Sequence, residues 1–300
     1  MPFMAHVDPG RLHRLALAVH DSGAAGDWFD RVLGARPLRH DEGSGEPRPP
    51  DERRGGGEAD LEGTDTRLFR LGGYPFILLS KGVSGGPVAR FLGRYGPAVH
   101  SLAWEVGDMW TTQNLLVQRG IGIGAVNIPG RHFFMHPRDT HGVLMEWTDD
   151  TFGPNGASGD TASGDTASGD TASGVVGVES LAWVTAAVTD AEATAAFLGD
   201  LAGATPVDGN ARGPEDRELT VDVRIGDVTL RLVTPCSAES PYASVLGGGP
   251  RLCTFAVRVS DLDAAVGTLA AAGTPTIRRD DGLAATDPAF TFGVAMEWTA

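Results

Sequence analysis

The stretch PAVHSLAWEV, Pro97–Val106, alternates apolar and polar side chains with the period of a β-strand. Leu102 and Trp104 lie on one face of such a strand, whereas Ser101 and Glu105 lie on the other. We expect the apolar face to pack against helices and the second face to line a cleft. The stretch therefore predicts a half-buried strand that brings polar side chains into an open site.

The surroundings of this stretch recur in the second half of the chain. LAWEVGDM (102–109) matches FAVRVSDL (255–262), and LMEWT (144–148) matches AMEWT (295–299). The matching segments follow one another in the same order in both halves, which chance does not produce. The sequence is therefore a tandem duplication.

Each half divides again into two modules with the pattern β-α-β-β-β. The predicted helices follow an Asp and end near a Gly, residues that favour helix starts and ends. We expect these helices near residues 24–33, 108–119, 190–201 and 261–272. The strands that open the modules are expected near residues 14–19, 101–106, 182–188 and 253–259.

The composition of the segments between the modules predicts the domain boundaries. Residues 151–175 contain three copies of Gly-Asp-Thr-Ala-Ser, a small and polar unit typical of a flexible linker. We therefore expect one domain at 1–150 and a second, more divergent one at 176–300. The segment near 41–62, rich in Gly, Pro and charge, is predicted to be a mobile loop.

Charge and hydropathy exclude several classes of partner. The formal charge of −15 argues against nucleic acid and acidic membranes, which need clustered Lys and Arg. No apolar run is long enough for a transmembrane helix and the first residues lack a signal-peptide pattern, so we expect a cytoplasmic protein. The two cysteines, Cys236 and Cys253, lack metal-type spacing and are expected to be free thiols.

Two segments resemble the vicinal oxygen chelate superfamily, whose members include glyoxalase I, extradiol dioxygenases, methylmalonyl-CoA epimerase and bleomycin-resistance proteins. They are VARFLGRYGPAVHSLAWEVGDM (88–109) and FFMHPRDTHGVLMEWTDD (133–150), which are most similar to the epimerase branch. The likeness is strong over about 11–150 and weaker over 178–300. It implies an α+β fold in which four βαβββ modules pair into two open, barrel-like glyoxalase-type domains. Such a fold hosts many reactions.

The resemblance also implies positions for the ligands of a divalent metal ion. In the first half they fall on Arg14, Ile77, Ser101 and Glu146. In the second half they fall on Trp183, Arg231, Thr254 and Glu297. Only the two glutamates are metal-ligating residues, so we favour no cofactor. We expect an Arg–Glu pair in each cleft instead, Arg14 with Glu146 and Arg231 with Glu297, because a guanidinium can satisfy a buried carboxylate.

His13 and His100 each lie one residue before an implied ligand position. By strand alternation they share the core face, and we expect strand-end histidines that are partly buried and hydrogen-bonded. The alternative is that β-bulges turn both inward. His13, His100 and Glu146 would then form a two-histidine, one-carboxylate metal site.

Three functions are consistent with these residues. The first is a small-molecule isomerase, epimerase, cyclase or lyase without an essential metal. Its catalytic residues would be Glu146, Glu105 and Arg14, of which either glutamate would be the general acid or base. The second is a resistance-type protein that sequesters an antibiotic or metabolite, and the third is a metal enzyme that uses the histidine site. The substrate-binding candidates are Ser101, Ile77, Trp183, Arg231, Thr254 and Glu297. Four modules in one chain favour a monomer with internal pseudo-twofold symmetry, or a homodimer.

Overall fold

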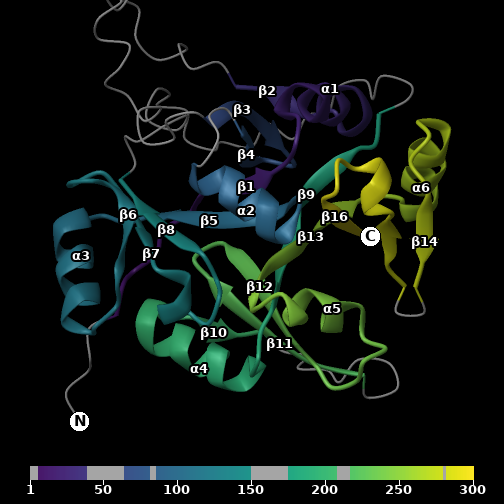
Figure 1. Ribbon diagram of the computed structural model, residues 1–300. Coiled ribbons are helices and arrows are strands. Elements are labelled where there is room, and N and C mark those ends of the chain that lie inside the picture. Colours follow the sequence, from purple (N-terminus) through teal and green to yellow (C-terminus); the bar gives the residue numbers. More distant parts are fainter. Residues whose placement is uncertain (1–5, 39–63, 82–85, 150–174, 208–216, 280–281) are drawn as a thin grey trace, which may run out of the picture.

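The computed structural model describes residues 6–38, 64–81, 86–149, 175–207, 217–279 and 282–300 of the 300-residue chain. The predicted loop near 41–62 lies outside the described residues, as does the predicted linker except for residue 175. The described chain forms two eight-stranded mixed sheets, one from each half (Figure 1). The predicted α+β architecture of four paired βαβββ modules is confirmed.

The N-terminal sheet has the strand order β2-β3-β4-β1-β5-β8-β7-β6. Its strands are β1 (Leu12–Ala18), β2 (Arg36–Pro37), β3 (Thr64–Leu71), β4 (Tyr74–Lys81), β5 (Ala98–Glu105), β6 (Ile123–Ile128), β7 (His132–Met135) and β8 (Met145–Thr148). The first strands of the two modules, β1 and β5, pair antiparallel at the centre of the sheet. Each also pairs in parallel with the last strand of its own module, β4 or β8.

The C-terminal sheet repeats this arrangement in the order β10-β11-β12-β9-β13-β16-β15-β14. Its strands are β9 (Val178–Ala187), β10 (Thr205–Pro206), β11 (Glu218–Ile225), β12 (Val228–Pro235), β13 (Arg251–Val259), β14 (Thr276–Arg278), β15 (Ala284–Thr286) and β16 (Ala295–Thr299). The equal topology confirms the duplication deduced from the sequence.

Four helices lie where the sequence predicts them, and each begins after a capping aspartate. They are α1 (Ser22–Leu33), α3 (Met109–Gln118), α4 (Ala191–Ala202) and α6 (Leu262–Ala271). The carboxylates of Asp21, Asp108, Asp190 and Asp261 accept a hydrogen bond from the backbone N–H three residues on. Two further helices, α2 (Pro87–Tyr95) and α5 (Pro241–Gly247), were not predicted, and short 3₁₀ turns occur at Pro137–Asp139 and Pro288–Phe290.

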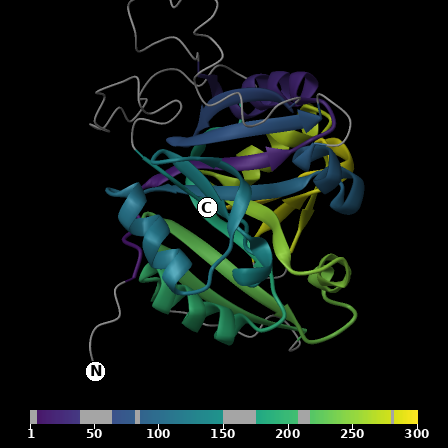
Figure 2. The same cartoon turned by 60° about the vertical axis from the view of Figure 1, so that its left-hand side comes forward.

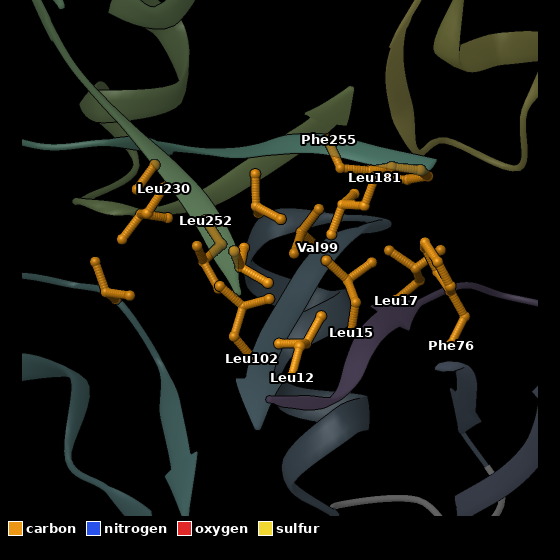
Figure 3. Close-up of a cluster of buried hydrophobic side chains, with 14 of the residues drawn as sticks. Leu12, Leu15, Leu17, Phe76, Val99, Leu102, Leu181, Leu230, Leu252 and Phe255 are labelled. Carbon is orange, nitrogen blue, oxygen red and sulfur yellow. The ribbon is translucent and has the colours of Figure 1, made fainter. Parts of the chain in front are cut away.

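The two sheets share one hydrophobic core. Side chains of β1 and β5, such as Leu15 and Leu102, face those of β9 and β13 across the interface (Figure 3). The rings of Phe76 and Phe255 lie 5.5 Å apart, and Trp104 Nε1 donates to the carbonyl of Ile225 at 3.2 Å. The apolar strand faces therefore pack against the opposite sheet as well as against helices, which the sequence analysis did not predict.

Contacts outside the core also join the two halves. Arg119, at the end of α3, donates to the carbonyl of Asp200 in α4 at 2.6 Å, so the end of α3 lies next to α4 (Figures 1 and 2). The backbone N–H of Leu12 donates to Asp227, in the turn between β11 and β12, at 2.6 Å. The opposite face of each sheet carries its own small apolar cluster, next to α2 or α5. We refer to these outer faces, where the sequence analysis expects the two clefts, as the N-terminal and the C-terminal cleft.

Candidate functional site

Two β-bulges decide which side chains enter the N-terminal cleft. Leu12 pairs with Trp104 but Arg14 pairs with Ala103, so His13 is an extra residue in β1. A second shift, between the pairs Ala16–Ser101 and Leu17–Val99, makes His100 an extra residue in β5. Because of the bulges, Leu12 and Leu15 both lie in the core. His13 and His100 are no longer on the core face. The expectation that both share the core face is therefore wrong, since simple alternation fails at a bulge.

Arg14 and Glu146 meet across the central strands of the sheet. In the register, Arg14 of β1 lies opposite Ala103 of β5, which lies opposite Glu146 of β8. The small side chain of Ala103 leaves room for the guanidinium to cross β5. Arg14 Nη2 donates to Glu146 Oε2 in an ion pair whose side chains are 10% and 2% exposed. The predicted Arg14–Glu146 pair is present.

Three donors converge on the Glu146 carboxylate. Oε2 accepts from Arg14 Nη2 and from His132 Nε2, the latter at 3.0 Å, while Oε1 accepts from the hydroxyl of Ser101. Arg14 Nη2 and His132 Nε2 lie 3.1 Å apart because both donate to the same oxygen. Arg14 and Ser101, two of the positions at which the resemblance implies metal ligands, therefore lie next to Glu146. There they donate hydrogen bonds to its carboxylate.

The donor–acceptor balance fixes the tautomers of the other two histidines. Arg14 Nη1 is 3.2 Å from His13 Nδ1, and since a guanidinium only donates, that nitrogen accepts. The single hydroxyl proton of Ser101 goes to Glu146, so Ser101 Oγ accepts from His100 Nδ1–H at 3.0 Å. His100 then carries its lone pair on Nε2, and its ring packs edge-on against Phe91 of α2, 4.8 Å away.

These contacts set the charges of the cluster. Burial alone would raise the pKa of Glu146, but the positive charge of Arg14, with His132 and Ser101, outweighs burial and holds that pKa well below its usual range. Burial lowers the pKa of His100, against a smaller opposing effect of the Glu146 charge. Glu146 is therefore ionised and His100 neutral near pH 7, and the guanidinium of Arg14 forms an ion pair with the carboxylate.

The residues of this cleft do not fit the divalent ion that the resemblance implies. Both oxygens of Glu146 already accept hydrogen bonds, and His13 Nδ1 accepts from Arg14. A fixed guanidinium beside the carboxylate repels a second cation. Across the described ranges, no group of three His, Cys, Asp or Glu side chains is arranged to hold a metal ion. The alternative metal site of His13, His100 and Glu146 is thus not formed, although the bulges on which it depends are present.

The other candidates of the first half lie apart from this cluster. Glu105 pairs with Arg11 at 2.7 Å, four residues along β5 from Ser101, which is about 13 Å at the strand rise. Ile77 is buried in the apolar cluster of the cleft face with Ala16 and Val88. The structure therefore brings Arg14, Ser101 and Glu146 together and leaves Glu105 at the strand end.

The C-terminal cleft repeats the carboxylate with other donors. Glu297 accepts from Arg279 Nη1 at 2.8 Å, from the hydroxyl of Tyr242 at 3.2 Å and from Trp183 Nε1 at 3.3 Å. The predicted Arg231–Glu297 pair is wrong. Arg231 instead forms two hydrogen bonds with Asp222, its cross-strand neighbour in β11, at 3.0 and 2.9 Å. An arginine opposite an aspartate finds a nearer partner than Glu297, which lies three strands away.

Trp183 and Thr254 line the same face. The guanidinium of Arg231 lies over the Trp183 ring, 3.8 Å from its centroid, and the ring is half-buried. The Trp183 ring therefore gives this face of the C-terminal sheet an aromatic surface, with a guanidinium above it. Thr254 is buried and donates to the carbonyl of Ala295 at 2.8 Å.

Sequence reasoning missed three donors: His132, Arg279 and Tyr242. For His132 the strand alternation is a signal. Phe134 pairs with Glu146, and His132, two positions before Phe134 on the same strand, lies on the same face. Tyr242 lies on the unpredicted helix α5, and Arg279 follows β14 at the edge of the sheet. For those two residues only the three-dimensional arrangement reveals the contact with Glu297.

Comparison with known proteins supports the fold. No family model matches the sequence, and the search of curated proteins found no match. A structure of a variant of 4-hydroxymandelate synthase from Streptomyces coelicolor is similar over 97% of this chain and 92% of its own, with a TM-score of 0.65 and 16% identity. The Mn(II)-bound glyoxalase from Novosphingobium aromaticivorans matches over 97% and 82%, with a TM-score of 0.58 and 12% identity.

Methylmalonyl-CoA epimerase from Mycobacterium tuberculosis matches over 40% of this chain and 87% of its own, with 24% identity and a TM-score of 0.37. The particular likeness to the epimerase branch therefore stays a prediction. The chain has a glyoxalase-type fold, with two domains of paired βαβββ modules. Among the described helices, none has the length and apolar character needed to span a bilayer.

Proposed function

We propose that this protein is an enzyme of the isomerase, epimerase, cyclase or lyase type that binds a small carbonyl-bearing molecule in its N-terminal cleft. The observation that carries the proposal is the Arg14 guanidinium, held against Glu146 at the position where related folds hold a divalent ion. A buried, pre-organised positive charge stabilises an enolate or other oxyanion as it forms. Arg14 would serve as that charge.

Glu146 has a positioning role in this proposal. Its low pKa makes it a weak base, and its two oxygens already hold Arg14, His132 and Ser101. Each of these donors would turn or shift without the carboxylate. We therefore assign to Glu146 the orientation of the guanidinium and of the Ser101 hydroxyl.

His100 is the residue that we propose as general base. Its Nδ1–H donates to Ser101, whose hydroxyl donates to Glu146, so the ring is oriented by a hydrogen-bonded chain that ends in a carboxylate. This leaves the Nε2 lone pair as the proton acceptor, on the cleft face beside Phe91. A neutral imidazole near pH 7 is suited to accept a proton from a carbon next to a carbonyl group.

The test is exchange of substrate protons with solvent. The protein is incubated in D₂O with a panel of small keto acids, hydroxy ketones and branched acyl thioesters, and proton NMR follows the loss of the signal next to the carbonyl. We expect at least one compound to exchange, and a fall of roughly 100-fold in the exchange rate for His100→Gln. Arg14→Lys keeps the charge but not the paired donors, so we expect a loss of similar size.

A matched control is Arg138→Lys, since this arginine lies in the 3₁₀ turn, is exposed and pairs with Asp139 and not with Glu146. It should exchange at the wild-type rate. Exchange that survives both His100→Gln and Arg14→Lys would contradict the proposed roles.

One observation favours the alternative of a sequestering protein. The polar groups around Glu146 are hydrogen-bonded to one another, and Arg14 is 8% exposed, as in the wall of a binding site. That alternative predicts compounds that raise the thermal unfolding temperature without any exchange. In that case Glu146→Gln would weaken binding and there would be no turnover to lose.

A further inference from the structure

The C-terminal cleft contains donors that the carboxylates of the protein do not use. Arg231 bonds to Asp222 through Nε and Nη2, and its side chain is 24% exposed. Across the part of the chain that the structure describes, Nη1 makes no hydrogen bond. The opposing charges of Asp222 and Glu297 outweigh burial and raise the pKa of Arg231, so the group stays charged. A charged N–H group above an indole ring is thus available to a ligand.

Thr185 lies beside Arg231 on the floor of the same cleft. The two residues are register partners on β9 and β12, and Thr254 of β13 is the partner of Thr185 on its other side. Val184 and Ala186 point into the shared core, so Thr185 points to the cleft. Its side-chain hydroxyl is completely buried and has no hydrogen-bond partner among the described residues.

An unpaired buried hydroxyl is costly to the protein. Leaving such a group without a partner destabilises the folded state by about 1–3 kcal/mol. A valine at this position would have nearly the same shape and would avoid that cost. The hydroxyl next to a partly exposed arginine therefore points to a ligand oxygen that satisfies both groups.

We propose that the C-terminal cleft is a second binding site, separate from the N-terminal one, for a small carboxylate with an aromatic or other flat apolar body. The carboxylate would accept from Arg231 Nη1 and from the Thr185 hydroxyl, which supply the charge-assisted bonds. The apolar body would lie against Trp183 and Tyr242, whose polar atoms are held by Glu297. A cationic ligand is disfavoured, since Asp222 and Glu297 are already paired with arginines.

The experiment uses the full chain and phenylacetate as the probe, with phenylacetamide and phenethylamine as matched neutral and cationic controls. Isothermal titration calorimetry should show phenylacetate binding, with the amide bound at least ten-fold more weakly and the amine not detectably. The paired substitution Arg231→Gln with Asp222→Asn removes the guanidinium without leaving an unpaired charge. We expect it to weaken phenylacetate binding by roughly 100-fold, whereas Arg258→Gln, an exposed arginine on β13, should leave the affinity unchanged.

Thr185→Val distinguishes a ligand-binding role of the hydroxyl from a structural role. We expect it to raise the thermal unfolding temperature of the free protein, since an unpaired hydroxyl is removed, and to weaken phenylacetate binding by roughly ten-fold. Absence of phenylacetate binding at millimolar concentration would overturn the inference, as would binding that survives both the paired substitution and Thr185→Val. A gain in stability with unchanged affinity would show that Thr185 takes no part. Because none of these variants touches Arg14 or His100, the result is independent of the proposed reaction.

Discussion

The two clefts carry the same glutamate with different partners. Glu146 and Glu297 occupy equivalent positions on β8 and β16, and each accepts from three donors that include one arginine. In the N-terminal cleft the arginine is Arg14 on the first strand of the domain, and in the C-terminal cleft it is Arg279 at the sheet edge. Each buried carboxylate is thus paired with an arginine, but that arginine can come from different parts of the sheet.

Solvent access separates the clefts further. The side chains of Arg14 and Glu146 are 10% and 2% exposed, whereas those of Arg279 and Glu297 are 28% and 6% exposed. Charges that are closer to water interact more weakly and cost less to separate. The N-terminal cluster should therefore depend more on each of its members, and the variants below test that difference.

The largest expected effect is that of Glu146→Gln. It leaves the Arg14 guanidinium buried without its counter-charge, which should lower the free energy of unfolding by about 3–5 kcal/mol. The matched substitution Glu297→Gln should cost about 1 kcal/mol, because Arg279 is partly solvated. Urea unfolding monitored by circular dichroism measures both. Equal losses would show that the two carboxylates are equally desolvated and would remove the proposed asymmetry.

A smaller effect is expected from an attempt to rebuild a metal site. Residues 14 and 101 both bond to Glu146, so Arg14→His with Ser101→His should place two imidazoles beside its carboxylate, a set suited to Zn²⁺ or Mn²⁺. At Zn²⁺ concentrations about 100-fold above the dissociation constant, the variant should gain about 2.7 kcal/mol of stability.

The matched pair in the second cleft is Trp183→His with Thr254→His. Arg279 would still hold Glu297 there, so we expect Zn²⁺ binding weaker by at least about ten-fold. Calorimetric titration of the apo-variants with Zn²⁺ compares the two affinities. Equal affinities would mean that Arg279 leaves the carboxylate easily, and no binding by the first variant would show that its cleft cannot open for an ion.

The sequence predicted most of the fold because its signals are local and repeated. The capping aspartates located four helices, and period-two alternation located the strand β5, which carries Leu102 and Trp104 in the core. Duplication doubled the evidence for each element. Helices α2 and α5 were missed because they are short.

The site was harder to predict because it depends on register and bulges. Counting residues along the strands correctly placed Arg14 and Ser101 in the same cleft as Glu146. The extra residues His13 and His100 reverse the rule of alternation, and no local signal in the sequence reveals a bulge. The prediction that Arg231 pairs with Glu297 was wrong because Asp222, on the adjacent strand β11, lies directly opposite Arg231. The sequence does not give the register of that pair of strands.

The smallest expected effect is the pH dependence that Glu146 gives to stability. Its pKa in the folded protein is lowered from the usual value of 4.5, so the folded state binds fewer protons than the unfolded state as the pH falls through that value. The resulting stability is fully present above about pH 5 and is lost at lower pH, by up to about 1.4 kcal/mol per pH unit. The difference in unfolding free energy between wild type and Glu146→Gln should therefore shrink between about pH 5 and pH 3. In Arg14→Gln the largest opposing charge is gone, so the pKa of Glu146 should be higher than in the wild type and this acid-dependent loss should become smaller. Urea unfolding of the three proteins over that range gives the comparison, and a wild-type difference that stays constant with pH would show that the Arg14 charge does not hold Glu146 in its ionised form.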